Sequence, residues 1–374
     1  MTKHVFGGII VVKDAKVGDI MQMTYSFRLY PTTDQENRLL DWLELCRRLY
    51  NIALEERQTS WETKKKSIGY TAQQNKLPAF KKDYPEYKAI HSQVLQDVLR
   101  RVDTAYKNFF AKRAGYPRFK GKERYVSVTY PQVDKVKDTF SRLAKGYIYL
   151  SKIGFVKIRI HREVDLSSAG RVNVKLRNNQ WYVNITCEVP ETNPSLLLKP
   201  KSVGIDVGLN TFVATSAGEL IDNPKYLRKK EKYLKRRGRQ LSRKQRGSHL
   251  KVTNQRQDFL HKVSHALVKK NDIIVAEDLQ IKNMVRNSRL SKSIHDAGWG
   301  KLLTYIDYKA HKNGKRFIKV PPKGTSQTCI CGANVPKDLS VRVHTCPKCG
   351  YTGDRDIVSA KIIELRGLQL LSAA

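Results

Sequence analysis

Three stretches of this 374-residue chain place acidic residues within or beside runs of apolar residues, where carboxylates are uncommon. Asp206 lies inside VGIDVGLNTFVATS, Glu277 follows DIIVA, and Asp354 and Asp356 open DRDIVSAKII. A buried carboxylate is costly unless something compensates its charge. Convergence of several carboxylates on divalent cations offsets that cost. Two Mg²⁺ ions held in this way can activate water for phosphodiester hydrolysis, with Mn²⁺ as an alternative ion.

The first two acids also have structural interpretations. Asp206 can cap the turn that follows it, although an acid between two β-branched residues is unusual at such a position. The alternation of side chains along a strand places Glu277 on the face of Ile273 and Val275, and Asp278 on the opposite face. We therefore predict Glu277 as a metal ligand and Asp278 as a surface or helix-start residue.

The third acid is chosen from a pair. Asp354 sits where the N-cap of a helix is expected, whereas Asp356 heads a helical face that continues through Ala360 and Ile363. We therefore predict Asp206, Glu277 and Asp356 as the catalytic, magnesium-binding residues. The chain offers neither a Ser-His-Asp arrangement nor a phosphate-binding P-loop as a competing site.

Four of the six cysteines form a cluster near the C-terminus. Two pairs of thiolates suit a structural, tetrahedral Zn²⁺ site, and the ligands expected are Cys329, Cys331, Cys346 and Cys349. The first pair is C-x-C, one residue shorter than the usual knuckle, so the sequence leaves its zinc binding open. His344 is an alternative ligand, although a surface histidine is the simpler interpretation. The isolated Cys46 and Cys187 are expected to be buried thiols.

The charge of the chain indicates a polyanionic partner. There are 71 Lys and Arg against 34 Asp and Glu, a net charge of +37, and phosphate is the obvious neutraliser of such a surplus. Residues 225–251 carry 13 basic residues and one acid. The nucleic-acid contacts expected there are Lys229, Lys230, Arg236, Arg237, Arg239 and Arg243.

Neither a membrane span nor a secretory leader is expected. No stretch is apolar enough to cross a bilayer, and residues 5–12 lack the pattern of a cleaved leader. We expect a cytoplasmic protein, associated with the nucleoid when it is bound to DNA. Residues 1–22 look like an N-terminal extension, and Met21 or Met23 is an alternative start.

The residue patterns predict elements that hold these acids in place. Residues 24–30 form a strand, a helix follows Thr33, and an amphipathic helix spans 92–112. Short strands are expected at 125–130, 146–150, 154–160, 171–177 and 180–189, in a small barrel or sandwich that the first strand can join. From residue 202 the pattern becomes α/β, with strands at 202–207, 211–216, 272–276 and 315–320 and helices at 254–270, 297–312 and 354–371.

The ordered motifs of the chain resemble the TnpB family, transposon-encoded relatives of type V CRISPR effectors. The matching stretches are YSFRLYPT, LYNIALEER, YPRFKG, VGIDVGLNTFVATS, IIVAEDL, GTSQTC, VPKDLSVRVHTCPKCG and DRD, which together cover nearly all of residues 23–370. The resemblance implies an RNA-guided, Mg²⁺-dependent DNA endonuclease that uses a guide RNA and cuts target DNA beside a short flanking motif. It implies no membrane and no obligate protein partner.

The resemblance also implies a multidomain α/β and β architecture. Its parts are an RNase H-like (RuvC) nuclease domain in two pieces, a zinc ribbon inserted between them, a wedge β-barrel and a helical recognition domain. The ranges expected are 201–325 and 351–374 for the nuclease, 326–350 for the ribbon, 23–30 and 115–200 for the barrel, and 31–114 for the recognition domain. In the last of these, Tyr50, Gln93 and Gln96 correspond to the region that reads the flanking motif, although core packing or solvent exposure explains them equally well.

Two departures from the family pattern bear on activity. The first knuckle reads C-I-C, and the family sequence D-x-N-A-A is D-I-V-S-A here, so that Val358 replaces an Asn and Ser359 an Ala. The alternative function is therefore a nuclease-inactive or decaying copy, acting as an RNA-guided DNA-binding protein or as a transposase accessory protein.

Overall fold

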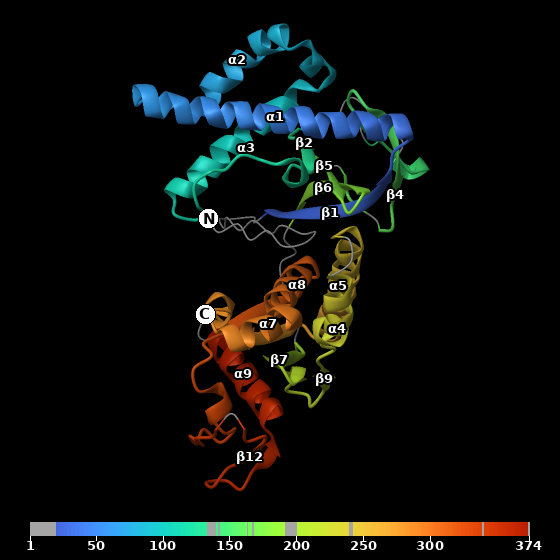
Figure 1. The fold of residues 1–374 in the computed structure, drawn as a ribbon. Helices are drawn as coiled ribbons and strands as arrows, with labels where there is room; N and C mark the ends of the chain where they lie inside the picture. The colour runs from blue at the N-terminus through green and yellow to red at the C-terminus, as the bar shows by residue number, and fades with distance from the viewer. Residues whose placement is uncertain are drawn as a thin grey trace. The chain divides into compact units, whose positions relative to one another are not determined.

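The computed structural model describes residues 20–132, 140, 143–162, 164–166, 168–190, 200–238, 242–338 and 340–372. The chain divides into two compact units, residues 1–190 and 191–374, which Figure 1 colours from blue to green and from yellow-green to red. No helix among the described residues has the length and apolar character that a membrane crossing requires.

The first unit is built on a six-stranded antiparallel sheet with the order β2-β5-β6-β1-β4-β3. The expected first strand does join this sheet, between β6 and β4. It begins at Ile20, so Ile20, Met21 and Gln22, which we had assigned to an N-terminal extension, pair with β6; residues 1–19 lie outside the described residues. The strands are β1 (Ile20–Tyr30), β2 (Ser127–Tyr130), β3 (Tyr147–Leu150), β4 (Gly154–Arg159), β5 (Ala169–Arg177) and β6 (Gln180–Pro190).

Helices pack beside this sheet. The longest, α1 (Thr33–Lys64), begins with a capping box in which Thr32 accepts from the Gln35 backbone and Gln35 binds the Thr32 backbone in return. Trp181 of β6 is buried in the core, and its indole donates to Glu36 at 3.0 Å. The remaining helical segments are α2 (Tyr70–Asp83), α3 (Ser92–Phe110) and the short turns Pro85–Ala89, Lys122–Arg124 and Leu143–Lys145.

The second unit contains a five-stranded mixed sheet with the order β11-β10-β7-β8-β9. Strands β7, β10 and β11 are parallel, whereas β7, β8 and β9 form antiparallel hairpins. Side chains on both faces of β7 and β10 are buried, which is expected where helices cover both sides of a parallel sheet. The strands are β7 (Ser202–Val207), β8 (Thr211–Thr215), β9 (Leu220–Asp222), β10 (Ile273–Glu277) and β11 (Arg316–Val320).

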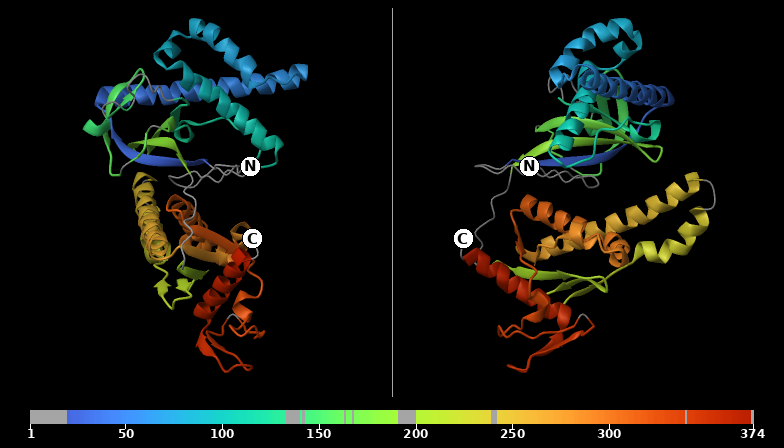
Figure 2. Two further views of the ribbon diagram at one scale, coloured as in Figure 1. Left: turned by 180° about the vertical axis from the view of Figure 1, so that it is seen from behind. Right: turned by 60° about the vertical axis from the view of Figure 1, so that its left-hand side comes forward.

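The helices of this unit lie on the two sides of the sheet, α9 on one and α5 and α8 on the other (Figure 2). Helix α5 begins at Ser242, twelve residues before the start that we predicted, and α4 precedes it. The helices are α4 (Tyr226–Gly238), α5 (Ser242–Lys270), α6 (Ile281–Met284), α7 (Ser288–Ala297), α8 (Trp299–Lys312) and α9 (Arg355–Ser372).

Two glycines let α9 lie directly on the sheet. A methyl group on Gly204 of β7 would come within 2.0 Å of the Ala360 carbonyl oxygen, and one on Gly367 would come within 2.5 Å of the Val275 methyl groups. At both crossings only a hydrogen atom fits. The N-terminal turn of α9 is thereby held close to the ends of β7 and β10.

A small cysteine-bearing lobe precedes α9. It consists of the turn Thr325–Gln327 and the two-stranded ribbon formed by β12 (Val343–Thr345) and β13 (Thr352–Asp354). Strand β13 ends at Asp354, and α9 starts at the next residue. The lobe therefore runs into α9 without a linker.

Candidate functional site

Asp206 and Glu277 come from neighbouring parallel strands. The last pair in the register between β7 and β10 is Ile205 with Ala276, so Asp206 and Glu277 are the next residues on each strand. Because parallel strands end at the same edge of a sheet, the two carboxylates stand side by side at the carboxyl ends of β7 and β10. Asp278, one residue further, is exposed and pairs with Lys319 at 3.7 Å, which confirms its interpretation as a surface residue.

The carboxylates influence one another electrostatically. Burial, together with the negative charges of Glu277 and Asp356, raises the pKa of Asp206 to about 7, against a smaller lowering by Arg355. A strongly perturbed carboxyl group among other acids is typical of functional sites. The structure thus places Glu277 and Asp356 close enough to Asp206 for their charges to act on its carboxyl group.

Glu277 has a hydrogen-bond partner that the sequence did not reveal. The buried Thr325 hydroxyl donates to the Glu277 carboxylate. Burial raises the pKa of Glu277, while this hydrogen bond and the Arg366 guanidinium lower it. Thr325 lies in the GTSQTC stretch, which was recognised as a motif but received no role because its partner is 48 residues away.

Asp356 is placed by the start of α9. The Asp354 side chain accepts from the backbone N–H groups of Asp356 at 2.8 Å and Ile357 at 3.2 Å, which confirms the predicted N-cap. Arg355, between the two acids, is buried and donates to the carbonyl oxygens of Asp338 at 2.9 Å and Val341 at 3.2 Å. Arg355 was not predicted, and it ties the first turn of α9 to the cysteine-bearing lobe.

The chemistry of this group suits hard divalent cations. All three donors are carboxylates, which Mg²⁺ prefers, and like charges held together need a counter-cation. Among the described residues, the group whose possible ligand atoms all lie within 4.8 Å of one another is formed by the four cysteines, and these three acids are not part of it.

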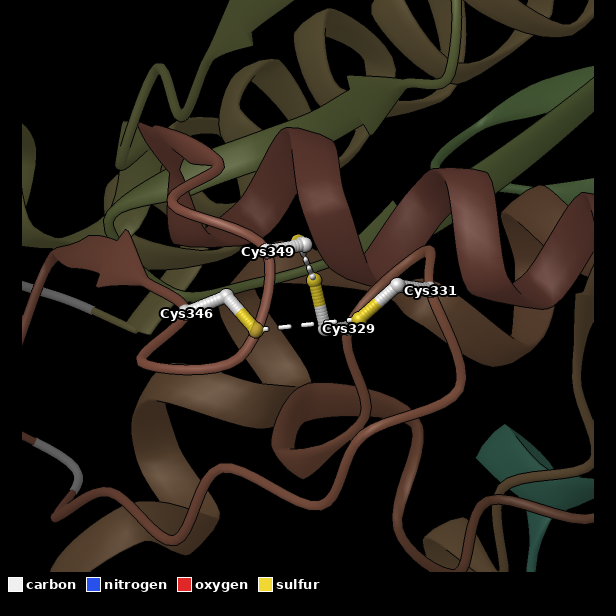
Figure 3. Close-up of side chains that lie close together, drawn as sticks. All are labelled: Cys329, Cys331, Cys346 and Cys349. Atoms are coloured by element: carbon white, nitrogen blue, oxygen red, sulfur yellow. Dashed lines mark hydrogen bonds between the residues drawn. The ribbon is translucent and has the colours of Figure 1, made fainter.

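The four predicted zinc ligands converge. Figure 3 shows their side chains turned toward a common centre, and their sulfur atoms all lie within 4.8 Å of one another. The sulfurs of Cys329 and Cys349 are 3.7 Å apart, as are those of Cys331 and Cys346. Tetrahedral Zn²⁺ with Zn–S bonds of about 2.3 Å requires sulfurs roughly 3.8 Å apart. The shortened C-x-C pair therefore reaches zinc-binding geometry.

His344 differs from the expectation of a surface residue. Its side chain is fully buried, its Nδ1 contacts the Lys337 amine, and burial lowers its pKa. It lies outside the group of sulfur ligands. The surface interpretation was wrong because β12 turns this residue into the lobe, where it packs near Tyr351.

The two departures in the DRDIVSA segment are both buried. Val358 and Ser359 are each 2% exposed, and the Ser359 hydroxyl has no hydrogen-bond partner among the described residues. Val358 is an apolar side chain where the family has an amide. The segment nevertheless keeps its helical form and the position of Asp356 at the second residue of α9.

The basic helix α4 is anchored by a buried acid. Both carboxylate oxygens of Asp296 accept from the Leu227 N–H, at 3.0 and 3.1 Å, at the start of α4. Lys229, Lys230 and Arg236 are exposed. The single acid of the helix, Glu231, forms ion pairs with Lys235 and Lys292. It therefore does not neutralise Lys229, Lys230 or Arg236.

The remaining predicted contacts of this stretch are only partly described. Arg237 lies in α4 and Arg243 in α5, but their side chains lie outside the description, and Arg239 lies outside the described residues altogether.

The three predicted contacts in the first unit differ in accessibility. Tyr50 is 3% exposed, and its ring packs 6.3 Å from that of Tyr125, so core packing describes it. Gln93 and Gln96 are half-buried on α3, and Gln93 donates to Gln132 at 3.0 Å.

Cys46 and Cys187 are buried free thiols, as predicted. The ring of His261 stacks on that of Tyr305, with the centroids 4.0 Å apart.

Comparison with known proteins identifies the family. A family model described as "Probable transposase" matches residues 184–288, and one described as "Cas12f1-like, TNB domain" matches residues 299–363. The chain is 32% identical to a putative RNA-guided DNA endonuclease of Streptomyces pristinaespiralis, over 93% of this chain and 90% of that protein. The identity is also 32% to the putative RNA-guided DNA endonuclease InsQ of Escherichia coli K12, over 93% of each chain. The chain belongs to the TnpB family.

Two further matches concern the fold. A family model described as "Helix-turn-helix domain" matches residues 21–66, which in this TnpB-family chain hold β1 and the single uninterrupted helix α1. The solved structure of the mini-RNA-guided endonuclease CRISPR-Cas_phi3 superposes with a TM-score of 0.53 at 11% identity, over 93% of this chain and 92% of that one. The chain thus has the multidomain α/β fold of such proteins.

Proposed function

We propose that this TnpB-family chain is an RNA-guided, Mg²⁺-dependent DNA endonuclease. Its catalytic carboxylates are Asp206, Glu277 and Asp356. The proposal is supported by the positions of Asp206 and Glu277 at the ends of the neighbouring strands β7 and β10 and of Asp356 at the start of α9, from where the charges of Glu277 and Asp356 raise the pKa of Asp206. The names of the relatives from Streptomyces pristinaespiralis and Escherichia coli agree with this activity.

Each residue of the proposed site has its own role. Asp206 and Glu277 would hold the cations at the edge of the sheet, and Thr325 fixes the Glu277 carboxylate by its hydrogen bond. Asp356 completes the group from the capped turn of α9. Bound Mg²⁺ would supply an activated water and stabilise the leaving oxygen of the phosphodiester. Arg355 offsets part of the negative charge around Asp206.

The domain scheme of the proposal follows the two units. Residues 201–325 and 351–374 form an RNase H-like (RuvC) nuclease, and residues 326–350, which carry the four clustered cysteines, form a zinc ribbon. The sheet of the first unit is the wedge barrel, and α1–α3 form the recognition helices. The partners are a guide RNA and a target DNA, which the Lys and Arg side chains of α4 contact in part. The protein acts in the cytoplasm, and at the nucleoid when it is bound to DNA.

The test begins with the RNA that the protein carries. The chain is purified from its host, the bound RNA is sequenced, and a DNA that matches it is incubated with the complex with and without Mg²⁺. Cleavage only with Mg²⁺, lost in Asp206→Ala and Glu277→Gln, is expected. Asp278→Asn is the matched control, because this neighbouring acid is exposed and paired with Lys319, and it should cut normally.

A second function is a guided DNA-binding protein without cleavage, or an accessory of the transposase. It is favoured by Val358 and Ser359, which stand where the family has an amide and an alanine. Tight, guide-dependent binding of a matched DNA that stays intact with Mg²⁺ would support it. Cleavage that depends on Asp206 would exclude it.

A further inference from the structure

Four aromatic rings cluster where α3 ends. This aromatic patch consists of Tyr106, Phe109, Phe110 and Tyr116. Tyr116 meets Phe109 edge-on at 5.2 Å and Tyr106 edge-on at 5.9 Å, while Phe110 lies 5.3 Å from Phe109 and 6.2 Å from Tyr106. These separations are those of contacting rings. The patch is one continuous aromatic surface rather than four independent side chains.

The patch is open to solvent instead of closing a core. Phe110 is 74% exposed, the largest value among the exposed large hydrophobic residues described, and Tyr116 is 49% exposed. Phe119, three residues further along, is 51% exposed. Contiguous exposed aromatic surface of this kind marks interaction sites.

The surroundings of the patch are basic. From Thr104 to Lys122 the chain has six Lys and Arg and no acid. Lys112, Arg113 and Arg118 are exposed, and none of them forms an ion pair with a described carboxylate. Proteins that hold single-stranded nucleic acid combine aromatic rings, on which the nucleotide bases stack, with Lys and Arg side chains that bind the phosphates.

The segment that carries the patch is held in place. Asn51 of α1 binds the backbone of Lys120 twice, accepting from its N–H at 2.8 Å and donating to its carbonyl at 3.1 Å. Tyr106 lies 5.6 Å from the guanidinium carbon of the buried Arg57, and its hydroxyl is 3.4 Å from that of Tyr116. Because these contacts tie Tyr106, Tyr116 and the backbone of Lys120 to neighbouring residues, binding would require little ordering of this part of the chain.

We propose that the aromatic patch binds unpaired bases of a single-stranded RNA, with Phe110 as the principal stacking surface. Duplexes hide their base faces by stacking, so a duplex would use only the basic side chains and leave Phe110 unused. Base–aromatic contact is tolerant of sequence, since every base has a π-face. Lys112, Arg113 and Arg118 hold the backbone of the same strand.

RNA is favoured over DNA by the proposed function, on which this part of the inference rests. A guide RNA stays with the protein while it searches, whereas target DNA arrives as a duplex. A guide RNA that stays bound would cover these exposed aromatic rings, which would otherwise favour aggregation. The patch thus deepens the guide-binding part of the proposal and is independent of the carboxylate centre.

The test measures RNA binding in an Asp206→Ala background, without Mg²⁺, so that cleavage plays no part. Fluorescence anisotropy follows a labelled oligouridine and a double-stranded RNA over a series of salt concentrations. Phe110→Ala is expected to weaken oligouridine binding roughly 5- to 100-fold with the same salt slope and to leave duplex binding unchanged. Arg113→Gln is expected to reduce the salt slope by about 0.7, one phosphate contact.

Matched variants and mapping keep the proposal falsifiable. Phe110→Tyr should bind like the parent, whereas Phe110→Leu, which keeps the apolar bulk without the ring, should bind weakly. Crosslinks from thiouridine-substituted RNA should map to Phe110 or Tyr116.

Several results would overturn the proposal. These are equal losses for oligouridine and duplex in Phe110→Ala, no loss for either, or tighter patch-dependent binding of single-stranded DNA than of RNA. Sedimentation that shows a dimer of the parent but a monomer of Phe110→Ala would assign the patch to self-association instead. A failure of the nuclease proposal would leave these binding results unaffected.

Discussion

Replacing Asp206 by asparagine should stabilise the metal-free protein at neutral and alkaline pH. Burial and the charges of Glu277 and Asp356 raise the Asp206 pKa from 3.8 to about 7. Between these values the folded chain holds a proton that the unfolded chain has released, so stability falls as the pH rises from about 4 to about 7. Three pKa units correspond to about 4 kcal/mol, and Asp206→Asn removes this cost because the amide carries no charge.

The assay is thermal unfolding with a chelator present, for the natural chain and Asp206→Asn, across pH 4 to 8. The unfolding free energy of Asp206→Asn should equal that of the natural chain at pH 4 and exceed it by about 4 kcal/mol at pH 8. At pH 8 this difference corresponds to a rise of roughly 10 °C in the melting temperature of the second unit. Adding Mg²⁺ at pH 8 should reverse the order, because the natural chain gains the binding free energy of the ion. The variant has lost a ligand and should gain less.

The pH dependence is what distinguishes this reasoning from a general effect of the substitution. A gain of the same size at pH 4 and pH 8 would mean that packing, not charge, separates the two proteins. A loss of stability at pH 8 without Mg²⁺ would show that Asp206 is compensated in the metal-free chain. Either result would refute the account of the carboxylate group. Asp278→Asn, an exposed acid, should change stability little at any pH.

Three further predictions concern the second unit. Gly204→Ala should destabilise it by about 3 kcal/mol, because the added methyl group meets the Ala360 carbonyl; unchanged denaturant unfolding would contradict the close crossing of α9. Ser359→Ala should raise the unfolding free energy by about 1–2 kcal/mol, since it removes a buried hydroxyl without a partner; a lowered melting temperature would reveal a hidden hydrogen bond. The protein should contain one zinc per chain by metal analysis, and Cys331→Ser should lose it; a zinc-free natural chain would argue against the site.

The strands and helices that hold the acids were predictable because their patterns are strong. Asp206 and Glu277 each lie near the end of a buried strand, and the Asp354 cap follows from its position before an amphipathic helix. The start of α5 was missed because residues 242–253 are mostly polar or charged and carry little apolar periodicity. Helix α2 was missed because Pro78 lies inside it and only two of its residues are buried.

Roles that depend on contacts between residues far apart in the chain could not be predicted from sequence patterns. Thr325 meets Glu277 across 48 residues, and Arg355 reaches back to carbonyls 14 and 17 residues earlier. Neither shows periodicity or ligand spacing. His344 was misjudged for the same reason, since its burial depends on how β12 and β13 fold over the lobe and not on its neighbours in the chain.

The direct junction of β13 and α9 fixes the angular position of Asp356. Asp354 is both the last residue of the strand and the cap of the helix, so no residue can be gained or lost there without consequence. One inserted residue would rotate the acid by about 100° around the helix axis and turn it away from Asp206. Length variation among relatives should therefore gather elsewhere in the cysteine-bearing lobe, and exchange of that lobe between proteins should succeed only where the count of residues from Cys349 to Asp356 is kept.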